Sequence, residues 1–291
     1  MSQAVLYDVQ GPKARRRVLL VSLLGGALLL VLLALAARRL AANGQFDYEK
    51  YEPFFTEPVL YERLLLTGLK NTLIAAAYAL VLALVLGVVL AFGRLSHRWF
   101  FRLPATAVVE VFRGLPLLLL ILGLFLAYPA VTGRDLSALW ALVIALSLYN
   151  GSVIAEIIRA GVLAVPRGQS EAAYAMGLGR GQTLRLVLLP QAVRVMLPAL
   201  ISQLVVLLKD TSLGFVIGYL EILRISGQLV QTLDNPIQLY GFVALVYIVV
   251  NGLLGMLAGY LERRGRRTAG GAKPVAPVDS GLAPTTAGAV L

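Results

Sequence analysis

The chain has 291 residues, of which 59% are hydrophobic and only 14% are charged. A soluble domain carries about a quarter charged residues, so this composition excludes an ordinary globular protein and indicates a lipid-embedded one. The net charge of +11 requires no nucleic-acid partner, because basic cytoplasmic loops give a membrane protein the same excess. The sequence has no cysteine and a single histidine, His97, which excludes disulfides, a cysteine nucleophile and a histidine-rich metal site.

Six apolar segments are long enough to cross the hydrocarbon core, which takes about 20 residues of helix. The sequence predicts these spans at 18–37, 69–92, 104–128, 138–160, 188–208 and 238–260. The first begins like a secretory signal peptide, but its apolar run is longer than the core of such a peptide, which favours a retained helix. The segment 211–231 carries Glu221 and Arg224 in its middle, so we expect it to lie on the outer side or to enter the bilayer only part-way.

The distribution of charge predicts the orientation. With the N-terminus in the cytoplasm, 15 Lys and Arg against 3 Asp and Glu fall in the inner segments 1–17, 93–103, 159–187 and 261–270. Only 7 Lys and Arg against 9 Asp and Glu fall in the outer segments 38–68, 129–137 and 209–237. Because basic residues gather on the cytoplasmic side, we expect an all-α integral membrane protein with six spans and both termini in the cytoplasm.

Both ends of the chain are expected to lie outside the bilayer. Residues 1–17 form a basic cytoplasmic N-terminus. Residues 268–291 are rich in Gly, Pro, Ala and Thr and contain almost no large apolar side chains. Such a segment cannot bury enough surface to order itself, so we expect a disordered cytoplasmic tail.

Two Glu-x-x-Arg pairs fall inside predicted spans, where an ionisable residue needs a partner or a water-filled cavity. Glu110 and Arg113 lie near the cytoplasmic start of the third span, and Glu156 and Arg159 near the cytoplasmic end of the fourth. Since these spans run in opposite directions, the two pairs should lie at a similar depth, where they can cross-pair and gate the inner end of a pathway. Alternatively each pair neutralises itself on its own helix, at roughly 0.2–0.5 kcal/mol per exposed pair.

Polar side chains at mid-depth are candidates for a substrate pathway. They are Tyr149, Asn150, Ser152, Ser202, Gln203, Lys209, Asp210, Thr211 and Ser212. The last four, KDTS, combine opposite charges with two hydroxyls, which suits a zwitterion, although a helix end in the headgroup layer would have the same composition. Pro116 and Pro198 interrupt the backbone hydrogen bonds of their spans, and kinks there suit helices that rock about a central site.

The longest inner connection contains EAAYAMGLGRGQTLRLVLLP at residues 171–190. Pro166 suits the first turn of a helix, and the alanine-rich run after Ser170 suits its body. Gly177 can end this helix in a left-handed conformation, and a second short turn at 183–188 leads to Pro190. The sequence predicts a helix–glycine–helix elbow that presents a compact surface to a cytoplasmic partner. A merely solvated loop is the alternative.

These residues resemble the EAA motif of ABC-importer permeases. The match comprises Glu171-Ala172-Ala173, Gly177 and Val187-Leu188-Leu189-Pro190, with valine where isoleucine is usual. Over about residues 65–262 the chain also resembles the polar amino-acid uptake permeases, through Asn71-Thr72, EVFRGLPLLLL (110–120), GSVIAEIIRAGVLAVPRGQSEAA (151–173) and LLKDTSLGFVIGYLEI (207–222). The added first span and the opening VLYDVQGPKARRR are most similar to the glutamate-uptake members.

The resemblance implies the permease subunit of a type I ABC importer, with a first transmembrane helix at 18–37, a permease domain at 65–262 and a coupling segment at 166–187. It implies docking to ATP-binding cassette ATPase subunits through Glu171, Ala172, Ala173, Gly177, Gly179 and Pro190. An extracytoplasmic solute-binding protein would deliver a polar amino acid, glutamate or a related one. A second permease subunit, identical or related, would complete the pathway.

The chain is not expected to be an enzyme or to hold a cofactor. It has no G-x-x-x-x-G-K-[ST] loop to cradle phosphates, so ATP and Mg would be bound by the partner ATPase subunit. H-E-x-x-H and G-x-S-x-G motifs are also missing, which argues against an intramembrane enzyme.

A secondary transporter or channel that needs no ATPase remains the alternative. Such folds are expected to show inverted repeats, of which the two Glu-x-x-Arg pairs are the only trace in this sequence. We therefore expect a multi-pass protein of the cytoplasmic membrane that works by alternating access, driven by a separate ATPase.

Overall fold

The structure is a computed structural model that describes residues 11–267, and every regular element in that range is helical. The longer helices are α1 (Pro12–Ala42), α4 (Lys70–Leu95), α5 (Trp99–Gly114), α6 (Leu117–Thr132), α7 (Ala138–Leu163), α10 (Leu189–Asp210), α11 (Ile222–Leu233) and α12 (Pro236–Arg267). Shorter elements connect them: η2 (Tyr48–Lys50), α2 (Pro53–Thr56), α3 (Pro58–Tyr61), η3 (Glu62–Leu69), α8 (Arg167–Ala175), α9 (Arg180–Gln182), η4 (Thr183–Leu188) and η5 (Thr211–Ile217). The predicted all-α fold is confirmed, while the predicted tail, 268–291, lies outside the described residues.

Five described helical stretches are long and apolar enough to cross a membrane, and the bent pair α5–α6 can count as a sixth. The five are Pro12–Ala42, Pro58–Leu95, Ala138–Leu163, Arg180–Ile217 and Pro236–Leu257. Each overlaps one of the predicted spans, so an apolar helix of sufficient length is present at five of the six predicted positions. The helices extend past the predicted limits because polar and basic residues continue them beyond the apolar run, as Arg15 to Arg17 do in α1.

The span predicted at 104–128 is present as two helices that are broken at Pro116, where the sequence predicts a kink. Helices α5 and α6 meet at an angle of 101°, with Leu115 and Pro116 between them in an extended conformation. Proline lacks a backbone N–H and disfavours a helical conformation in the residue before it, so the predicted break at Pro116 has a local cause. By contrast, α10 remains helical through Pro198.

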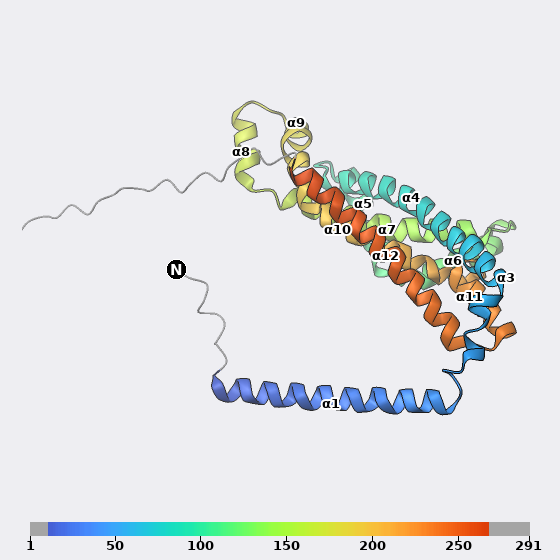
Figure 1. The fold of residues 1–291 in the computed structure, drawn as a ribbon. Helices are drawn as coiled ribbons and strands as arrows, with labels where there is room; N and C mark the ends of the chain where they lie inside the picture. The colour runs from blue at the N-terminus through green and yellow to red at the C-terminus, as the bar shows by residue number, and fades with distance from the viewer. Residues whose placement is uncertain (1–10, 268–291) are drawn as a thin grey trace, which may run out of the picture.

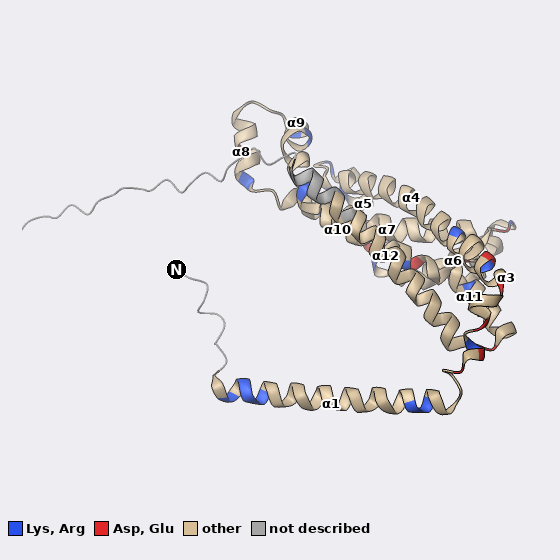
Figure 2. Ribbon diagram, viewed as in Figure 1, with Lys and Arg blue, Asp and Glu red and all other residues tan. Residues whose placement is uncertain are grey.

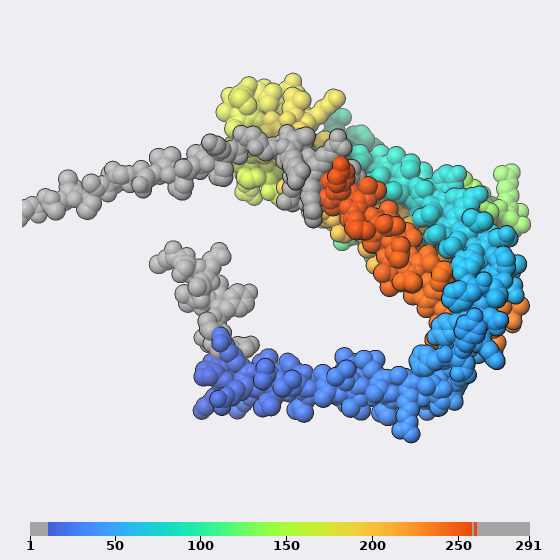
Figure 3. Space-filling view, viewed as in Figure 1, coloured from blue at the N-terminus to red at the C-terminus, as the bar shows by residue number. Residues whose placement is uncertain are grey.

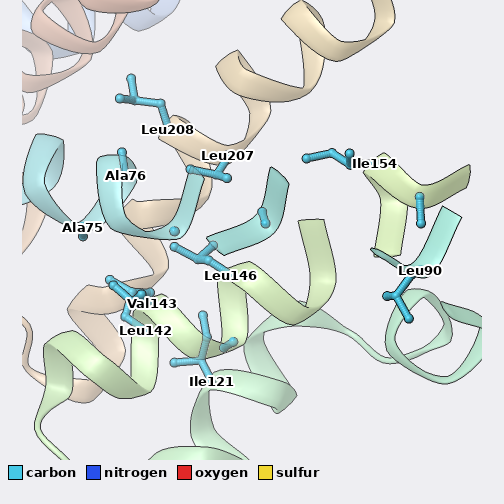
Figure 4. Close-up of a cluster of buried hydrophobic side chains, with 14 of the residues drawn as sticks. Ala75, Ala76, Leu90, Ile121, Leu142, Val143, Leu146, Ile154, Leu207 and Leu208 are labelled. Carbon is cyan, nitrogen blue, oxygen red and sulfur yellow. The ribbon is translucent and has the colours of Figure 1, made fainter. Parts of the chain in front are cut away.

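Helices α4 and α7 pack most closely in the bundle. Every fourth residue on one face of α4 is small and buried: Ala75, Ala79, Ala83, Gly87 and Ala91. Small residues at this spacing let two helix backbones approach, which drives helix association in lipid. Larger side chains of α4, α6, α7 and α10 fill the space around this contact, among them Leu90, Ile121, Leu146, Ile154 and Leu207 (Figure 4).

Replacing Gly87 by leucine is expected to separate α4 from α7. A Cβ atom on Gly87 would lie 2.5 Å from Cγ2 of Ile154 and 3.0 Å from the carbonyl oxygen of Gly151, so neither backbone can yield locally. Overpacking of this kind costs roughly 1–3 kcal/mol or more. Thermal unfolding of the purified protein in detergent measures the loss. Gly252→Leu adds the same side chain to α12 at a position where, among the described residues, no atom outside the local helix backbone lies within 4 Å of the new Cβ. Equal unfolding temperatures for both variants would contradict the prediction.

The two ends of the bundle differ in structure and charge. Helices α8 and α9 lie at one end, below called the α8 end, and α3 and α11 lie at the opposite end, the α11 end (Figure 1). The start of α1 and the end of α12 both lie toward the α8 end. Acidic residues gather near α3 and α11 (Figure 2). This arrangement agrees with the charge pattern, which predicts that the α8 end is cytoplasmic.

Helix α1 stands clear of the bundle (Figure 3). Within the described range it buries none of its residues, and its attachment is at the α11 end. There Nε2 of Gln238 donates to the carbonyl oxygen of Gln45 at 2.5 Å, and Nζ of Lys50 donates to that of Asp234 at 2.7 Å. The apolar surface of α1 is thus left for lipid or for another chain.

The segment 211–231 does not form a span, as expected. It begins as the short helix η5, turns at Gly218 with a left-handed φ of 78°, and continues as α11. At 12 residues α11 is too short to cross a bilayer. One face of α11, with Ile222, Ile225 and Leu229, is buried together with residues of η3 and α12.

Candidate functional site

Five charged side chains from three helices meet toward the α8 end and form what we call the inner ion-pair cluster. They are Arg94 of α4, Glu110 and Arg113 of α5, and Glu156 and Arg159 of α7. Glu156 is the centre: its carboxylate lies 2.7 Å from Nη1 of Arg94, 2.7 Å from Nη2 of Arg159 and 3.8 Å from Nη1 of Arg113. One carboxylate therefore joins α4, α5 and α7.

The sequence left open whether the two Glu-x-x-Arg pairs bind each other or each pairs within its own helix, and the structure shows both kinds of contact. Arg159 pairs with Glu156 on its own helix through two hydrogen bonds, of 2.7 and 3.2 Å. Arg113 reaches across to Glu156, whereas Glu110 pairs with Arg94 at 3.2 Å. Glu156 thus contacts Arg113 and Arg159 directly, and Glu110 joins the same cluster through a fifth residue, Arg94. Their role as a gate stays a prediction.

Sequence reasoning missed Arg94, which it counted among the residues of a solvated inner loop. The structure extends α4 to Leu95, and only 8% of the Arg94 side chain is exposed. Arg94 follows the buried Gly87 by seven residues, or about two helical turns, and so falls on the face of α4 that packs against α7. This spacing is the sequence feature that could have predicted the contact of Arg94 with α7.

The coupling elbow, residues 166–187, projects from the α8 end of the bundle (Figure 1). Pro166 precedes α8, and Gly177 follows it with a φ of 81°, so the predicted left-handed stop is confirmed. The N–H of Gly177 donates to the carbonyl of Tyr174 at 2.9 Å, and that of Leu178 to the carbonyl of Ala173 at 3.1 Å. These bonds satisfy the last carbonyls of α8 and turn the chain sharply.

The elbow has a fixed inner side and an open outer side. Ala173 is only 1% exposed, and Leu184 and Leu188 pack with buried residues of α7 and α10. Glu171, Ala172, Gly177, Gly179 and Pro190 are exposed. Tyr174 and Met176 add large apolar surface to this outer side, with exposed fractions of 48% and 73%. An elbow of this kind can bind a partner outside and pass a displacement to two long helices.

The predicted pathway residues are mostly engaged within the bundle. A direct side-chain hydrogen bond links two of them, from Nε2 of Gln203 on α10 to Oδ1 of Asn150 on α7, at 2.7 Å. The hydroxyls of Ser152 and Ser202 donate to carbonyls of their own helices, and Tyr149 is half-buried. The Asn150–Gln203 bond therefore fixes α7 against α10 at mid-depth.

The KDTS run forms the end of α10 and the start of η5. The Thr211 hydroxyl donates to the carbonyl of Leu208 at 2.6 Å, and the Ser212 hydroxyl to that of Lys209 at 2.8 Å. Lys209 is exposed and Asp210 is half-buried. Both hydroxyls are used by the local backbone, which favours a helix end over an open receptor for a zwitterion.

Glu221 is a second residue whose role the sequence did not reveal. Its side chain is fully buried and caps α11, accepting hydrogen bonds from the N–H groups of Leu223 at 2.8 Å and Arg224 at 2.5 Å. The hydroxyl of Tyr247 on α12 donates to the same carboxylate at 3.3 Å. Burial raises the pKa of Glu221 to about 7, although the two backbone hydrogen bonds oppose this shift. The signal in the sequence was weak, because glutamate is not among the residues preferred at the start of a helix.

Asn71 and Thr72 hold the turn that precedes α11. Nδ2 of Asn71 donates to the carbonyl of Leu220 at 2.9 Å, and the hydroxyl of Tyr219 donates to the carbonyl of Asn71 at 2.9 Å. The hydroxyl oxygen of Thr72 accepts from the N–H of Ile222 at 3.3 Å. This pair of residues, noted in the sequence only for its resemblance, therefore ties α4 to the α11 end.

Known proteins are similar to this chain in sequence and in fold. Residues 83–267 match the model of the family described as binding-protein-dependent transport system inner membrane component. The glutamate transport system permease protein GluD of Corynebacterium glutamicum is 43% identical over 232 residues, which cover 77% of this chain and 83% of GluD. The glutamate/aspartate import permease protein GltK of Escherichia coli is 36% identical over 212 residues, covering 69% and 92%.

A solved structure of a transporter of the same kind is also similar to this chain in fold. The crystal structure of an amino acid ABC transporter with histidines matches with a TM-score of 0.68 and 32% sequence identity, over 72% of this chain and 98% of that one. The match extends over nearly the whole of the solved chain, so the fold of the bundle and that of the known transporter subunit are alike.

Proposed function

This chain belongs to the family of binding-protein-dependent transport system inner membrane components, and we propose that it is the permease subunit of an ATP-driven importer for glutamate or a related polar amino acid. The coupling elbow is the observation that carries this proposal. Its inner side is packed against α7 and α10, and its outer side exposes Glu171, Gly177 and large apolar groups. The names of the relatives GluD and GltK support glutamate as the substrate.

The proposed mechanism is alternating access driven from outside the chain. ATP-binding cassette ATPase subunits, which bind ATP and Mg, dock on the outer side of the elbow in the cytoplasm. Their closure moves the elbow, and the shared packing of Leu184 and Leu188 passes that movement to α7 and α10. The inner ion-pair cluster then holds α4, α5 and α7 together and closes the inner end.

The assembly needs further components. A solute-binding protein delivers the amino acid at the α11 end, which we place outside the cytoplasmic membrane, with both termini inside. A second permease subunit, identical or related, completes the pathway. The described residues form a single bundle, and α1 buries none of its residues against it, so this helix is free to contact another subunit. We propose that the Asn150–Gln203 hydrogen bond holds α7 against α10 beside this pathway.

Uptake by proteoliposomes tests the function. We expect accumulation of radiolabelled glutamate only when ATP is inside and when the candidate ATPase subunit, the second permease subunit and the binding protein are all present. Omission of the ATPase should reduce uptake to the level of empty vesicles. Uptake driven by an ion gradient with this chain alone would instead show a secondary transporter, and preference for another amino acid would correct the substrate alone.

A further inference from the structure

An apolar groove runs between α4 and α5 toward the α8 end. It has a volume of about 500 Å³, and its lining includes Val89, Gly93, Phe101, Ala105 and Val108. Its floor is narrow because the helices approach closely there: a Cβ atom on Gly93 would lie 2.8 Å from that of Ala105. Its walls are open, since Val89 is 63% and Phe101 is 51% exposed.

The end of this groove is basic and aromatic. The connection between α4 and α5 supplies His97 and Arg98, and Arg102 follows in the first turn of α5; all three are exposed. No ion pair to any of these three is present in the described part of the chain, and no acidic residue lies between residues 94 and 102. Trp99 and Phe100, each 68% exposed, lie beside them, which is typical of a helix end at a membrane interface.

We propose that this groove binds an anionic phospholipid of the cytoplasmic leaflet, with an acyl chain along Val89 and Val108 and the phosphate at Arg98 and Arg102. The apolar walls match an acyl chain, and the basic end matches an anionic headgroup at the depth where headgroups lie. The proposal rests on the membrane orientation given above. It does not depend on which substrate is transported.

Charge argues against a second copy of this chain as the occupant. The segments on this side hold 15 Lys and Arg against 3 Asp and Glu, so another copy would bring mainly like charge to Arg98 and Arg102. Glu110 and Glu156, which lie in spans near this level, are already paired with arginines. An anionic lipid supplies the missing negative charge.

The groove adjoins the inner ion-pair cluster. Gly93 at its floor is next to Arg94, and Glu110, the partner of Arg94, follows the lining residue Val108 by two positions. A bound lipid would therefore brace α4 against α5 at the point where the Arg94–Glu110 pair already joins them. Its binding is expected to stabilise the folded bundle.

Thermal unfolding of the purified, delipidated protein in detergent tests the proposal. Added phosphatidylglycerol should raise the unfolding temperature by about 2–4 °C, and phosphatidylcholine or inorganic phosphate should raise it much less. The shift should be lost in the double variant Arg98→Gln/Arg102→Gln and in Val89→Trp, which fills the groove from an exposed position. The double variant Arg16→Gln/Arg17→Gln removes the same charge from α1 and should keep the shift.

Four results would overturn the proposal. Equal stabilisation by phosphatidylcholine would remove the role of charge, and equal stabilisation by inorganic phosphate would show an anion site without an acyl chain. A shift that persists in both groove variants would place the lipid elsewhere. Because the chain has no cysteine, Val89→Cys also provides a direct check: disulfide-linked pairs formed on oxidation would show that a second copy covers this face.

Discussion

Replacing Gly177 by aspartate is expected to abolish association with the ATPase subunit while leaving membrane insertion intact. Gly177 has a φ of 81°, a conformation that costs a non-glycine residue of order 1–3 kcal/mol when it is held there. Apart from its chain neighbours, no atom of residues 11–267 lies within 4 Å of the position that its Cβ would occupy. The new side chain therefore points into open space, where we expect the ATPase subunit to dock.

Co-purification and a titration of the ATPase subunit against the permease measure this effect. We expect the affinity to fall at least tenfold, or by about 1.4 kcal/mol, and ATP-driven uptake to be lost with it. Gly133→Asp is the matched comparison, because Gly133 has a similar left-handed φ of 68° and equally open surroundings, but lies between α6 and α7. If Gly177→Asp binds the ATPase as tightly as Gly133→Asp does, the elbow is not the docking surface.

The features that the sequence predicted correctly are those with local causes. Spans follow from apolar length alone, because lipid requires it wherever the helix lies in the bundle. The left-handed turn at Gly177 and the break at Pro116 follow from the conformations that these residues allow. The angle of 101° between α5 and α6 could not be predicted from the sequence. A break in a helix permits many angles, and the packing of α6 on α7 selects one of them.

The arrangement of the inner ion-pair cluster depends on which helices are neighbours. The sequence placed Glu110, Arg113, Glu156 and Arg159 at one depth, since antiparallel spans bring their ends together. It could not show Arg94 among them, because that contact follows from the close packing of α4 on α7 through Gly87. Contacts between helices far apart in sequence, such as Asn150 with Gln203, were hidden for the same reason.

Replacing Glu156 by glutamine is expected to destabilise the inner end far more than the same change at Glu110. Glu156 is the only carboxylate within 4 Å of Arg113 and Arg159 in the described structure, and it shares Arg94 with Glu110. Its loss leaves three guanidinium groups around a neutral amide, with Arg94 only 8% exposed. Breaking a fully buried pair costs 3–5 kcal/mol, and the partial exposure of this cluster reduces the expected cost to roughly 2–3 kcal/mol.

The comparison with Glu110 decides whether Glu156 is the centre of the cluster. Glu110 is 60% exposed and pairs only with Arg94, so Glu110→Gln should cost about 1 kcal/mol or less. Unfolding in detergent measures both losses, and ATPase activity without substrate should rise in Glu156→Gln if the inner end no longer closes. Adding Arg94→Gln to Glu156→Gln should recover part of the stability, because it removes the most buried of the three remaining guanidinium charges. Equal losses for the two glutamates, with no recovery in the double variant, would mean that each pair acts alone and that the three helices are not joined through one carboxylate.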